Sequence, residues 1–203
     1  MKPDRFYQKC YRVVWFFVGV LFYNITIVGK ENIPKGAAMA CANHSSKIDP
    51  FLLAFVFGIE EQLHIIAKVS LFKIPLIARI IRKLGMISVD RDMSDVTTIK
   101  NTLAYLKKGE KVGIFPEGTR VSRDGEVKAK SGAVKIAERA GVPVIPIFIP
   151  RKKPLLRSRK ITVVIGEPFV IEKQTEKRTP EDYTAIADDL MDKIAALDPK
   201  NPS

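Results

Sequence analysis

Short apolar runs rich in β-branched residues recur along the chain and alternate with stretches in which apolar positions repeat every three to four residues. The first pattern predicts strands, and the second predicts helices that bury one face. This alternation predicts an α/β fold, with a mixed, mostly parallel central sheet flanked by helices. In such sheets ligands collect at the carboxyl ends of the strands. Strands are predicted from Asn24 onward and over 37–42, 63–68, 86–89, 112–115, 144–149 and 161–165.

Several of the predicted helices carry recognisable start or stop signals. The helices over 95–108 and 133–140 are each followed by a glycine, Gly109 and Gly141, and glycine is the usual residue just past a helix end. The last helix is predicted to begin after Thr179, which is followed directly by a proline and two acidic residues. This sequence is a helix-capping pattern. These signals predict short, well-bounded helices between the strands.

A basic amphipathic helix is predicted to start at Pro75. Its Leu and Ile residues form one face and its Lys and Arg residues line another. This pattern fits a helix at a membrane interface and fits equally a helix that packs on a core and leaves its charged side in water. The apolar face consists of Leu76, Ile77, Ile80, Ile81 and Leu84, and the basic side of Arg79, Arg82 and Lys83.

The N-terminal region combines basic residues with an uncharged stretch over 13–28. This stretch is shorter than the roughly 20 apolar residues of a membrane-spanning helix, and from Asn24 it changes to strand-type alternation. We therefore predict a membrane-associating helix over 1–23 that enters one leaflet, followed by a single α/β domain over 24–203. An ordinary core-packing helix is the alternative. The aromatic residues expected to hold the lipid are Trp15, Phe16, Phe17 and Tyr23.

The formal net charge of +12 requires a polyanionic partner, which can be nucleic acid, an anionic membrane or a phosphorylated substrate. The densest basic cluster, over 151–160, contains no aromatic residue for stacking on bases, which argues against nucleic acid. The partner of this cluster stays open: it can be the membrane, the phosphates of coenzyme A or an acidic carrier protein. The two cysteines, Cys10 and Cys41, are too few for a disulfide framework, and no Cys/His spacing fits zinc.

His44 and Asp49 form the strongest candidate for chemistry. His44 follows the predicted strand 37–42, and Asp49 comes five residues later, where a helix is expected to begin. In that arrangement the carboxylate can bind one imidazole nitrogen and leave the other to take a proton from a substrate hydroxyl. Alternatively, Asp49 only caps the helix together with Ser46. The other histidine, His64, has no acid in motif spacing, and we assign it a structural role.

A second motif, residues 115–120, follows another predicted strand. Its sequence, Phe-Pro-Glu-Gly-Thr-Arg, places Gly118 and Thr119 in a turn with free backbone amides. Arg120 then offers a guanidinium that suits a bidentate grip on a phosphate group. A plain surface turn is the alternative.

Taken together, these motifs resemble those of the glycerolipid acyltransferase family, specifically the 1-acyl-glycerol-3-phosphate acyltransferases, over nearly the whole chain. The segment 43–49, Asn-His-Ser-Ser-Lys-Ile-Asp, resembles the first block of that family, and 115–120 resembles the third. The second block is matched by residues 67–68, Leu71, Ile74-Pro75 and 89–91, and the fourth block by residues 144–147. The connection between the third and fourth blocks is matched by residues 130–133 and 140–143.

The resemblance implies transfer of a fatty acyl group from acyl-CoA or acyl-carrier protein to the sn-2 hydroxyl of 1-acyl-glycerol 3-phosphate (lysophosphatidic acid), giving phosphatidic acid. His44 would be the general base and Asp49 would orient it. Arg120 is the first candidate for the acceptor phosphate, and no metal or redox cofactor is expected. Further candidates for phosphate binding are Glu117, Gly118, Thr119, Lys68, Arg91 and Lys130.

Two departures from the family pattern leave the acceptor open. Val121 stands where the family usually has serine, and Ala78 stands where it often has glycine. Glycerol 3-phosphate or another lyso-lipid is the alternative acceptor, and a thioester hydrolase or a non-catalytic lipid-surface protein are further alternatives. We expect a peripheral or monotopic protein on the cytoplasmic face of the cell membrane, with an anionic membrane surface, the two substrates and an acyl-carrier protein as partners and no nucleic acid.

Overall fold

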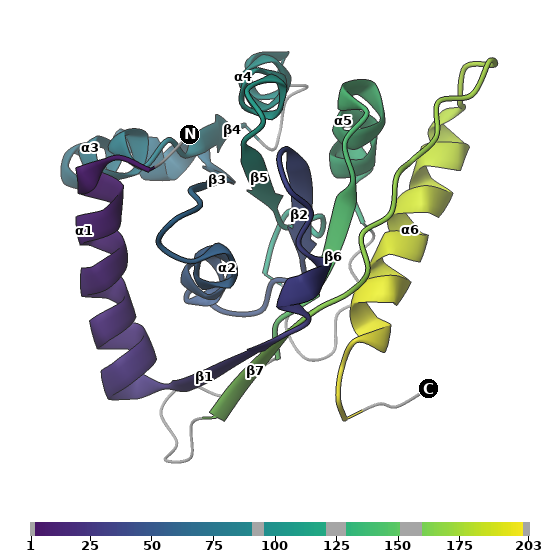
Figure 1. Ribbon diagram of the computed structural model, residues 1–203. Helices are drawn as coiled ribbons and strands as arrows, with labels where there is room; N and C mark the ends of the chain where they lie inside the picture. Colours follow the sequence, from purple (N-terminus) through teal and green to yellow (C-terminus); the bar gives the residue numbers. More distant parts are fainter. Residues whose placement is uncertain (1–2, 91–95, 121–128, 151–159, 201–203) are drawn as a thin grey trace.

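Seven strands form one sheet in the computed structural model, which describes residues 3–90, 96–120, 129–150 and 160–200 (Figure 1). The strands are β1 (Asn24–Val28), β2 (Ala38–Ala42), β3 (Leu63–Lys68), β4 (Ile87–Val89), β5 (Lys111–Ile114), β6 (Val144–Phe148) and β7 (Lys160–Ile165). Their spatial order is β1-β7-β6-β2-β5-β3-β4, and every neighbouring pair is parallel except β6 with β7. The predicted mixed, mostly parallel sheet is therefore confirmed.

Helices cover both faces of this sheet. In Figure 1 the helices α1, α2 and α3 lie on one side, and α4, α5 and α6 lie on the other, with α4 nearest β4 and β5. The α-helices are α1 (Arg5–Val14), α2 (Asp49–Phe57), α3 (Pro75–Lys83), α4 (Val96–Lys107), α5 (Gly132–Ala140) and α6 (Pro180–Ala196). A π-helical segment η1 (Trp15–Phe22) continues α1, and η2 (Lys30–Asn32) and η3 (Val69–Lys73) are 3₁₀ helices.

The central strand β2 is fully buried because both of its faces lie in a hydrophobic core. Ala38, Ala40 and Ala42 pack into the core shared with α2. Met39 and Cys41 point to the other face of the sheet and pack into the core shared with α5 and α6. The small alanine side chains leave room for α2 close to the sheet. Because β2, β3, β4, β5 and β6 run parallel, their carboxyl ends all reach the same edge.

The capping signal at the last helix is confirmed. The hydroxyl of Thr179 accepts a hydrogen bond from the backbone N–H of Asp182, and the Asp182 carboxylate accepts one from the N–H of Thr179. The pair satisfies two N–H groups that a helix start otherwise leaves without partners. It fixes the start of α6, which closes the second core.

The N-terminal helix packs on the α/β domain through two of the aromatic residues that are predicted to contact lipid. Trp15 stacks edge-on against Phe55 of α2, with ring centroids 4.8 Å apart, and Tyr23 also lies against the core. These two side chains are partly buried against the protein, so lipid can reach only part of each. Phe16 and Phe17, on the opposite side of the same helix, are about half exposed. The α1–η1 helix thus has a buried face and an open apolar face.

Helix α3 is divided in the same way. Ala78 and Ile81 are buried against the domain, whereas Leu76 is 71% exposed and Ile77 and Ile80 also lie open. Neither core packing nor a membrane interface alone accounts for this helix, because some of its apolar residues are buried against the domain and others are exposed. An apolar face that no part of the protein covers is unfavourable in water and indicates a non-aqueous environment or a partner.

His64 is a buried structural residue, as predicted, but it does have an acidic partner. Its Nε2 lies 3.0 Å from the Glu110 carboxylate, its Nδ1 lies 2.9 Å from the Gly85 carbonyl oxygen, and its ring stacks on Tyr105. Burial lowers the pKa of the imidazole, while its contacts with the Gly85 carbonyl and the Glu110 carboxylate act in the opposite direction. These contacts join the end of α3 to β3 and β5, at the sheet edge opposite the carboxyl ends.

The replacement Gly85→Ala tests this junction. Gly85 has φ of +65°, and an added Cβ would lie 2.6 Å from His64 Nδ1. Gly109→Ala is the matched control, because Gly109 has φ of +81° with open space around its Cβ position. We expect Gly109→Ala to lower the free energy of unfolding by roughly 1–2 kcal/mol through backbone strain alone. Gly85→Ala should cost about 1–3 kcal/mol more, because it also displaces a buried hydrogen bond. Equal midpoints in urea denaturation of the two variants would contradict this.

Candidate active site

The turn between β2 and α2 brings His44 and Asp49 together. His44 Nδ1 lies 2.9 Å from Asp49 Oδ2, and the same oxygen accepts the backbone N–H groups of Ser45 at 2.7 Å and Ser46 at 2.6 Å. Asp49 is the first residue of α2 and is buried. Its bond to Ser46 is half of the capping box considered above, so the carboxylate organises the helix start and the histidine at once.

The direction of the hydrogen bond fixes which nitrogen of the His44 ring faces Asp49 as a donor. Because a carboxylate only accepts, Nδ1 donates this bond, so in the neutral imidazole Nε2 is the nitrogen that has the lone pair. Among the described residues none forms a hydrogen bond with Nε2, and the side chain is 11% exposed. The ring also stacks on Phe115, with centroids 4.2 Å apart. The free nitrogen of a held imidazole is suited to remove a proton from a bound hydroxyl.

Asn43 anchors this turn to the sheet, a role that sequence reasoning missed. Its side-chain amide donates to the Ile149 carbonyl at 2.8 Å, and its carbonyl oxygen accepts the Ile149 N–H at 2.7 Å. The amide thereby continues the pairing of β2 with β6 one step past the end of the strands. Its position directly before His44 was the only signal in the sequence, since Ile149 is 106 residues away.

Glu117 supports the histidine from the neighbouring strand end. The carboxylate is buried and accepts the backbone N–H of His44 at 3.1 Å. Arg120, three residues later on the same turn, is exposed. Glu117 thus holds the His44 backbone in place from the end of β5.

The turn after β5 presents two cations beside the histidine. Gly118 has φ of +66°, and the Lys130 side chain packs so closely on it that an added Cβ would lie 2.9 Å from Lys130 Cε. The Lys130 backbone N–H donates to the Pro116 carbonyl oxygen at 2.8 Å. Arg120 and Lys130 both form no ion pair with any described residue. Together with the exposed Thr119 they make this turn suitable for an anion.

The remaining predicted phosphate ligands are less well placed or not described. Lys68 is exposed at the end of β3, which is two strands away from β2 in the sheet. Arg91 lies outside the described residues, as do Val121 and most of the 151–160 cluster. In the described part of the chain, no group of three His, Cys, Asp or Glu side chains could hold a metal ion.

An apolar cavity lies beside the first turn of α2, the helix that begins with Asp49. It has a volume of about 680 Å³ and lies between α1, α2 and α3, where most of its lining is aliphatic or aromatic. Lys47 and Pro50, the residues on either side of Ile48-Asp49, line one part of it. The region of the dyad therefore combines a cationic turn after β5 with an apolar cavity beside the start of α2. The lining of the cavity also includes Tyr7, Val14, Ala54, Ile65 and Ile81.

Comparison with known proteins agrees with this geometry. The sequence model of the family described as acyltransferase matches residues 24–150. The 1-acyl-sn-glycerol-3-phosphate acyltransferase of Bacillus subtilis is 35% identical over 187 residues, which cover 90% of this chain and 89% of the relative. A probable 1-acyl-sn-glycerol-3-phosphate acyltransferase of Mycoplasma pneumoniae is 32% identical over 78% of this chain, which spans only 61% of that relative.

A solved structure shares the fold. The crystal structure of PlsC, the 1-acyl-sn-glycerophosphate acyltransferase of Thermotoga maritima, superposes with a TM-score of 0.65. The match covers 98% of this chain and 78% of that structure at 26% sequence identity. The likeness therefore extends through the N-terminal helix as well as the sheet.

Proposed function

Because this chain belongs to the acyltransferase family, we propose that it transfers a fatty acyl group from a thioester to the sn-2 hydroxyl of 1-acyl-glycerol 3-phosphate and so makes phosphatidic acid. The observation that carries the proposal is the His44–Asp49 pair, which leaves Nε2 free beside a cationic turn. The named relatives support the acceptor, since the Bacillus subtilis protein, matched over 89% of its length, acts on this lysophospholipid by its name.

His44 acts as the general base. Nε2 takes the proton of the acceptor hydroxyl while its oxygen attacks the thioester carbonyl, and Asp49 stabilises the imidazolium that forms. The tetrahedral intermediate collapses as the carbon–sulfur bond breaks, and the leaving thiolate takes the proton back from Nε2. General-base help of this kind is typically worth about 10²–10⁴-fold in rate. The two bonds from Ser45 and Ser46 hold Asp49, so the base is oriented before substrate binds.

The cationic turn binds the acceptor phosphate. In 1-acyl-glycerol 3-phosphate the phosphate is close to the reacting hydroxyl, so its site must lie near His44. Arg120 and Lys130 meet this condition, because Phe115 of the same segment stacks on the His44 ring. A guanidinium and an ammonium together can balance the charge of a phosphate monoester.

The apolar cavity accommodates an acyl chain. Both substrates carry one, and a cavity of about 680 Å³ lined mainly by hydrophobic side chains is suited to an aliphatic chain. The lining residues Lys47 and Pro50, on either side of Ile48-Asp49, support a binding mode in which the chain's carboxyl end points toward the dyad. A fatty acyl group therefore fits this site better than a short acyl group would.

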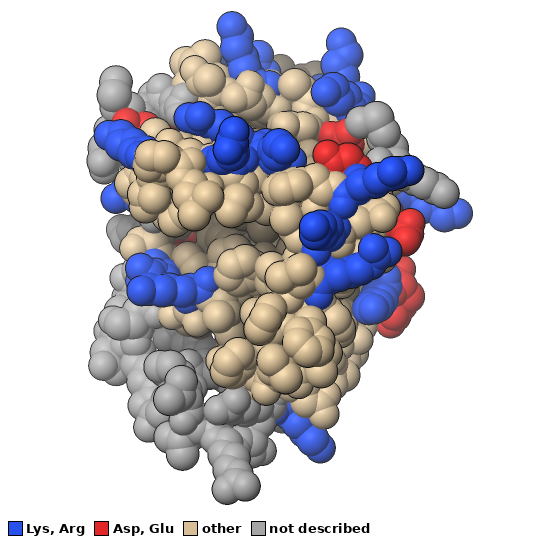
Figure 2. Space-filling view, turned by 90° about the vertical axis from the view of Figure 1, so that its left-hand side faces the viewer, with Lys and Arg blue, Asp and Glu red and all other residues tan. Residues whose placement is uncertain are grey.

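The open faces of α1–η1 and α3 bind an anionic membrane surface. Figure 2 shows this side of the protein, where uncharged residues dominate, Lys and Arg side chains are interspersed, and a hollow lies between them. Apolar side chains with nearby cations are typical of a protein that inserts partly into one leaflet. No helix in the described part of the chain has the length and hydropathy needed to cross a bilayer. The exposed apolar residues of this face include Val13, Phe16, Phe17, Val20, Leu21, Phe22, Leu76, Ile77 and Ile80.

The first test replaces the dyad. His44→Ala and Asp49→Asn should each lower the formation of phosphatidic acid by about 10²-fold or more, because the general base is removed or loses its orientation. Labelled oleoyl thioester and a panel of acceptors should be incubated with the protein and the lipid product identified. Near wild-type rates in variants with unchanged circular dichroism would reject the mechanism. Release of free fatty acid alone would indicate a hydrolase.

The second test concerns the phosphate. Arg120→Ala should raise the KM for 1-acyl-glycerol 3-phosphate by roughly tenfold, as expected for loss of a charged hydrogen bond, and leave the KM for the thioester unchanged. Arg139→Ala is the control, because Arg139 is also exposed but lies in the last turn of α5. If both variants changed the acceptor KM alike, the effect would be one of general charge and the assignment would be wrong.

The third test concerns the membrane. Phe17→Asp with Leu76→Asp should release the protein from vesicles that contain anionic lipid, because both side chains lie on the open apolar face. Val170→Asp provides the control, since Val170 is 56% exposed and follows β7 on another part of the molecule. The measurement is co-flotation on a density gradient. Undiminished flotation of the double variant would place the membrane contact elsewhere.

A further inference from the structure

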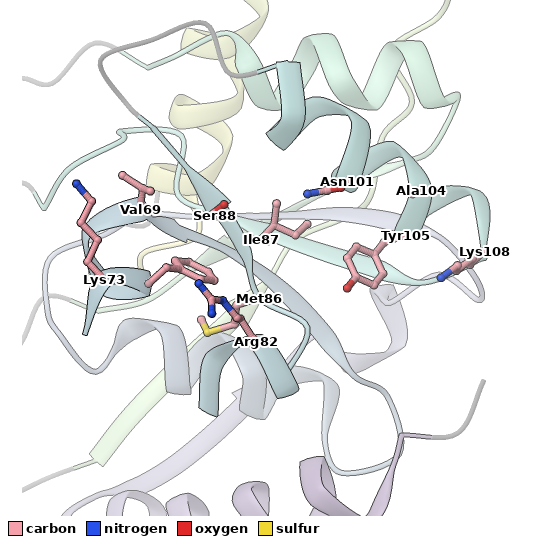
Figure 3. A pocket seen from close by; sticks show the side chains of 11 residues that line it. Val69, Lys73, Arg82, Met86, Ile87, Ser88, Asn101, Ala104, Tyr105 and Lys108 are labelled. Atoms are coloured by element: carbon pink, nitrogen blue, oxygen red, sulfur yellow. The ribbon is translucent and has the colours of Figure 1, made fainter. Parts of the chain in front are cut away.

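A second cavity, here called the edge cavity, lies beside β4, the last strand of the sheet. It has a volume of about 630 Å³ and lies between η3, α3 and α4 (Figure 3). Three cations from three different elements line it, Lys73 of η3, Arg82 of α3 and Lys108 just after α4. No carboxylate of a described residue lines the cavity, and none of the three cations forms an ion pair with a described residue.

We propose that the edge cavity binds the phosphate of the acyl donor, at the end of the phosphopantetheine arm that coenzyme A and acyl-carrier protein have in common. The proposal rests on the proposed acyl-transfer function and adds to it where the donor is held. Figure 3 shows Lys73 and Lys108 at opposite ends of the cavity, with Arg82 between them. Cations without ion-pair partners that line a hollow lower the electrostatic cost of binding an anion, and phosphate is the anion that a thioester donor carries.

Ring contacts and a side-chain hydrogen bond hold the walls of the edge cavity in place. Tyr105 is fixed by stacking on His64, with ring centroids 3.8 Å apart, and Lys108 Nζ lies 5.6 Å from the centroid of the Tyr105 ring. The Ser88 carbonyl on the edge of β4 already accepts the Thr98 hydroxyl at 2.6 Å. This bond occupies part of the edge and disfavours pairing with an added peptide strand.

The distance to the dyad favours the donor over the acceptor. In the sheet β4 is three strands away from β2, and neighbouring strands lie about 4.8 Å apart, so β4 is roughly 14 Å from the strand that leads to His44, measured across the sheet alone. The part of the cavity lined by Tyr105 and Lys108 is farther still, because it lies toward the opposite ends of the strands. The acceptor phosphate is too close to its own hydroxyl to reach so far. In the donor a long pantetheine arm separates the phosphate from the thioester, and that arm can span this distance.

The position of the cavity also favours the donor over a lipid headgroup. One wall is formed by Asn101, Tyr105 and Lys108 of the α4 region, which packs on the core shared with α5 and α6. The membrane face proposed above belongs instead to α1 and α3. The edge cavity thus lies at the border of that face and is open to a donor that arrives from water.

The test removes two of the cations and varies the donor. Lys73→Ala with Lys108→Ala is compared with Lys100→Ala with Lys107→Ala, which removes the same charge from exposed positions outside the cavity. The donors are oleoyl-CoA, oleoyl-carrier protein, oleoyl-phosphopantetheine and oleoyl-pantetheine, the last without a phosphate. We expect the first variant to raise the KM for phosphate-bearing donors about tenfold or more, with the KM for oleoyl-pantetheine and for the acceptor unchanged.

The outcomes separate the explanations. If the cavity variant has a larger KM than the wild-type protein for oleoyl-CoA, the natural source of the phosphate is the nucleotide thioester. If its KM is larger for oleoyl-carrier protein, the source is the carrier. Either result supports phosphate binding in the edge cavity. An equal loss with oleoyl-pantetheine, or the same loss in the control variant, overturns it. Reduced vesicle binding with unchanged donor KM overturns it in favour of a lipid headgroup. Absence of transfer by the wild-type protein with every donor rejects the proposed function itself.

Discussion

Asp49 Oδ2 accepts three hydrogen bonds, from His44 Nδ1 and from the backbone N–H groups of Ser45 and Ser46. The carboxylate is buried at the first turn of α2, where water cannot take over these bonds. The chain direction after β2, the start of α2 and the orientation of the imidazole are therefore linked through one oxygen atom. Any change that moves this oxygen also moves the base, so the local fold and the chemistry of the site are inseparable.

The parallel sheet brings the rest of the site to this point. Because β2, β5 and β6 run in the same direction, the residues that follow them meet at one edge. The Asn43 side chain forms a hydrogen bond with the backbone of Ile149, which follows β6 in the chain. Glu117, which follows β5, accepts a hydrogen bond from the backbone N–H of His44. The base is thus held on both sides by residues from neighbouring strand ends. This support keeps the imidazole in place, and Arg120, which we propose as a phosphate ligand, lies on the same turn as Glu117.

The surface explains how one chain handles two amphipathic substrates. Helices α1 and α3 each bury one apolar side and expose another, and the cavity between them and α2 is lined in part by Lys47 and Pro50, on either side of Ile48-Asp49. The net charge of +12 is distributed accordingly. Some cations border the exposed apolar face, Arg120 and Lys130 flank the turn beside His44, and three more line the edge cavity. In the function proposed above, apolar contact and charge act together in binding lipid and donor.

The sequence alone determined what depends on near neighbours in the chain. Hydrophobic periodicity gave the strands and helices, Thr179 and Asp182 gave a helix start, and five residues of spacing were enough to pair His44 with Asp49 within one turn. Only the tertiary structure decided which distant residues meet. Periodicity shows that one face of a helix is apolar but not what covers it, so it could not separate Trp15, packed on Phe55, from the exposed Phe16. Nor does local spacing encode the contacts of Asn43 with Ile149 or of His64 with Glu110, because those form only when parallel strands and helix ends are brought together.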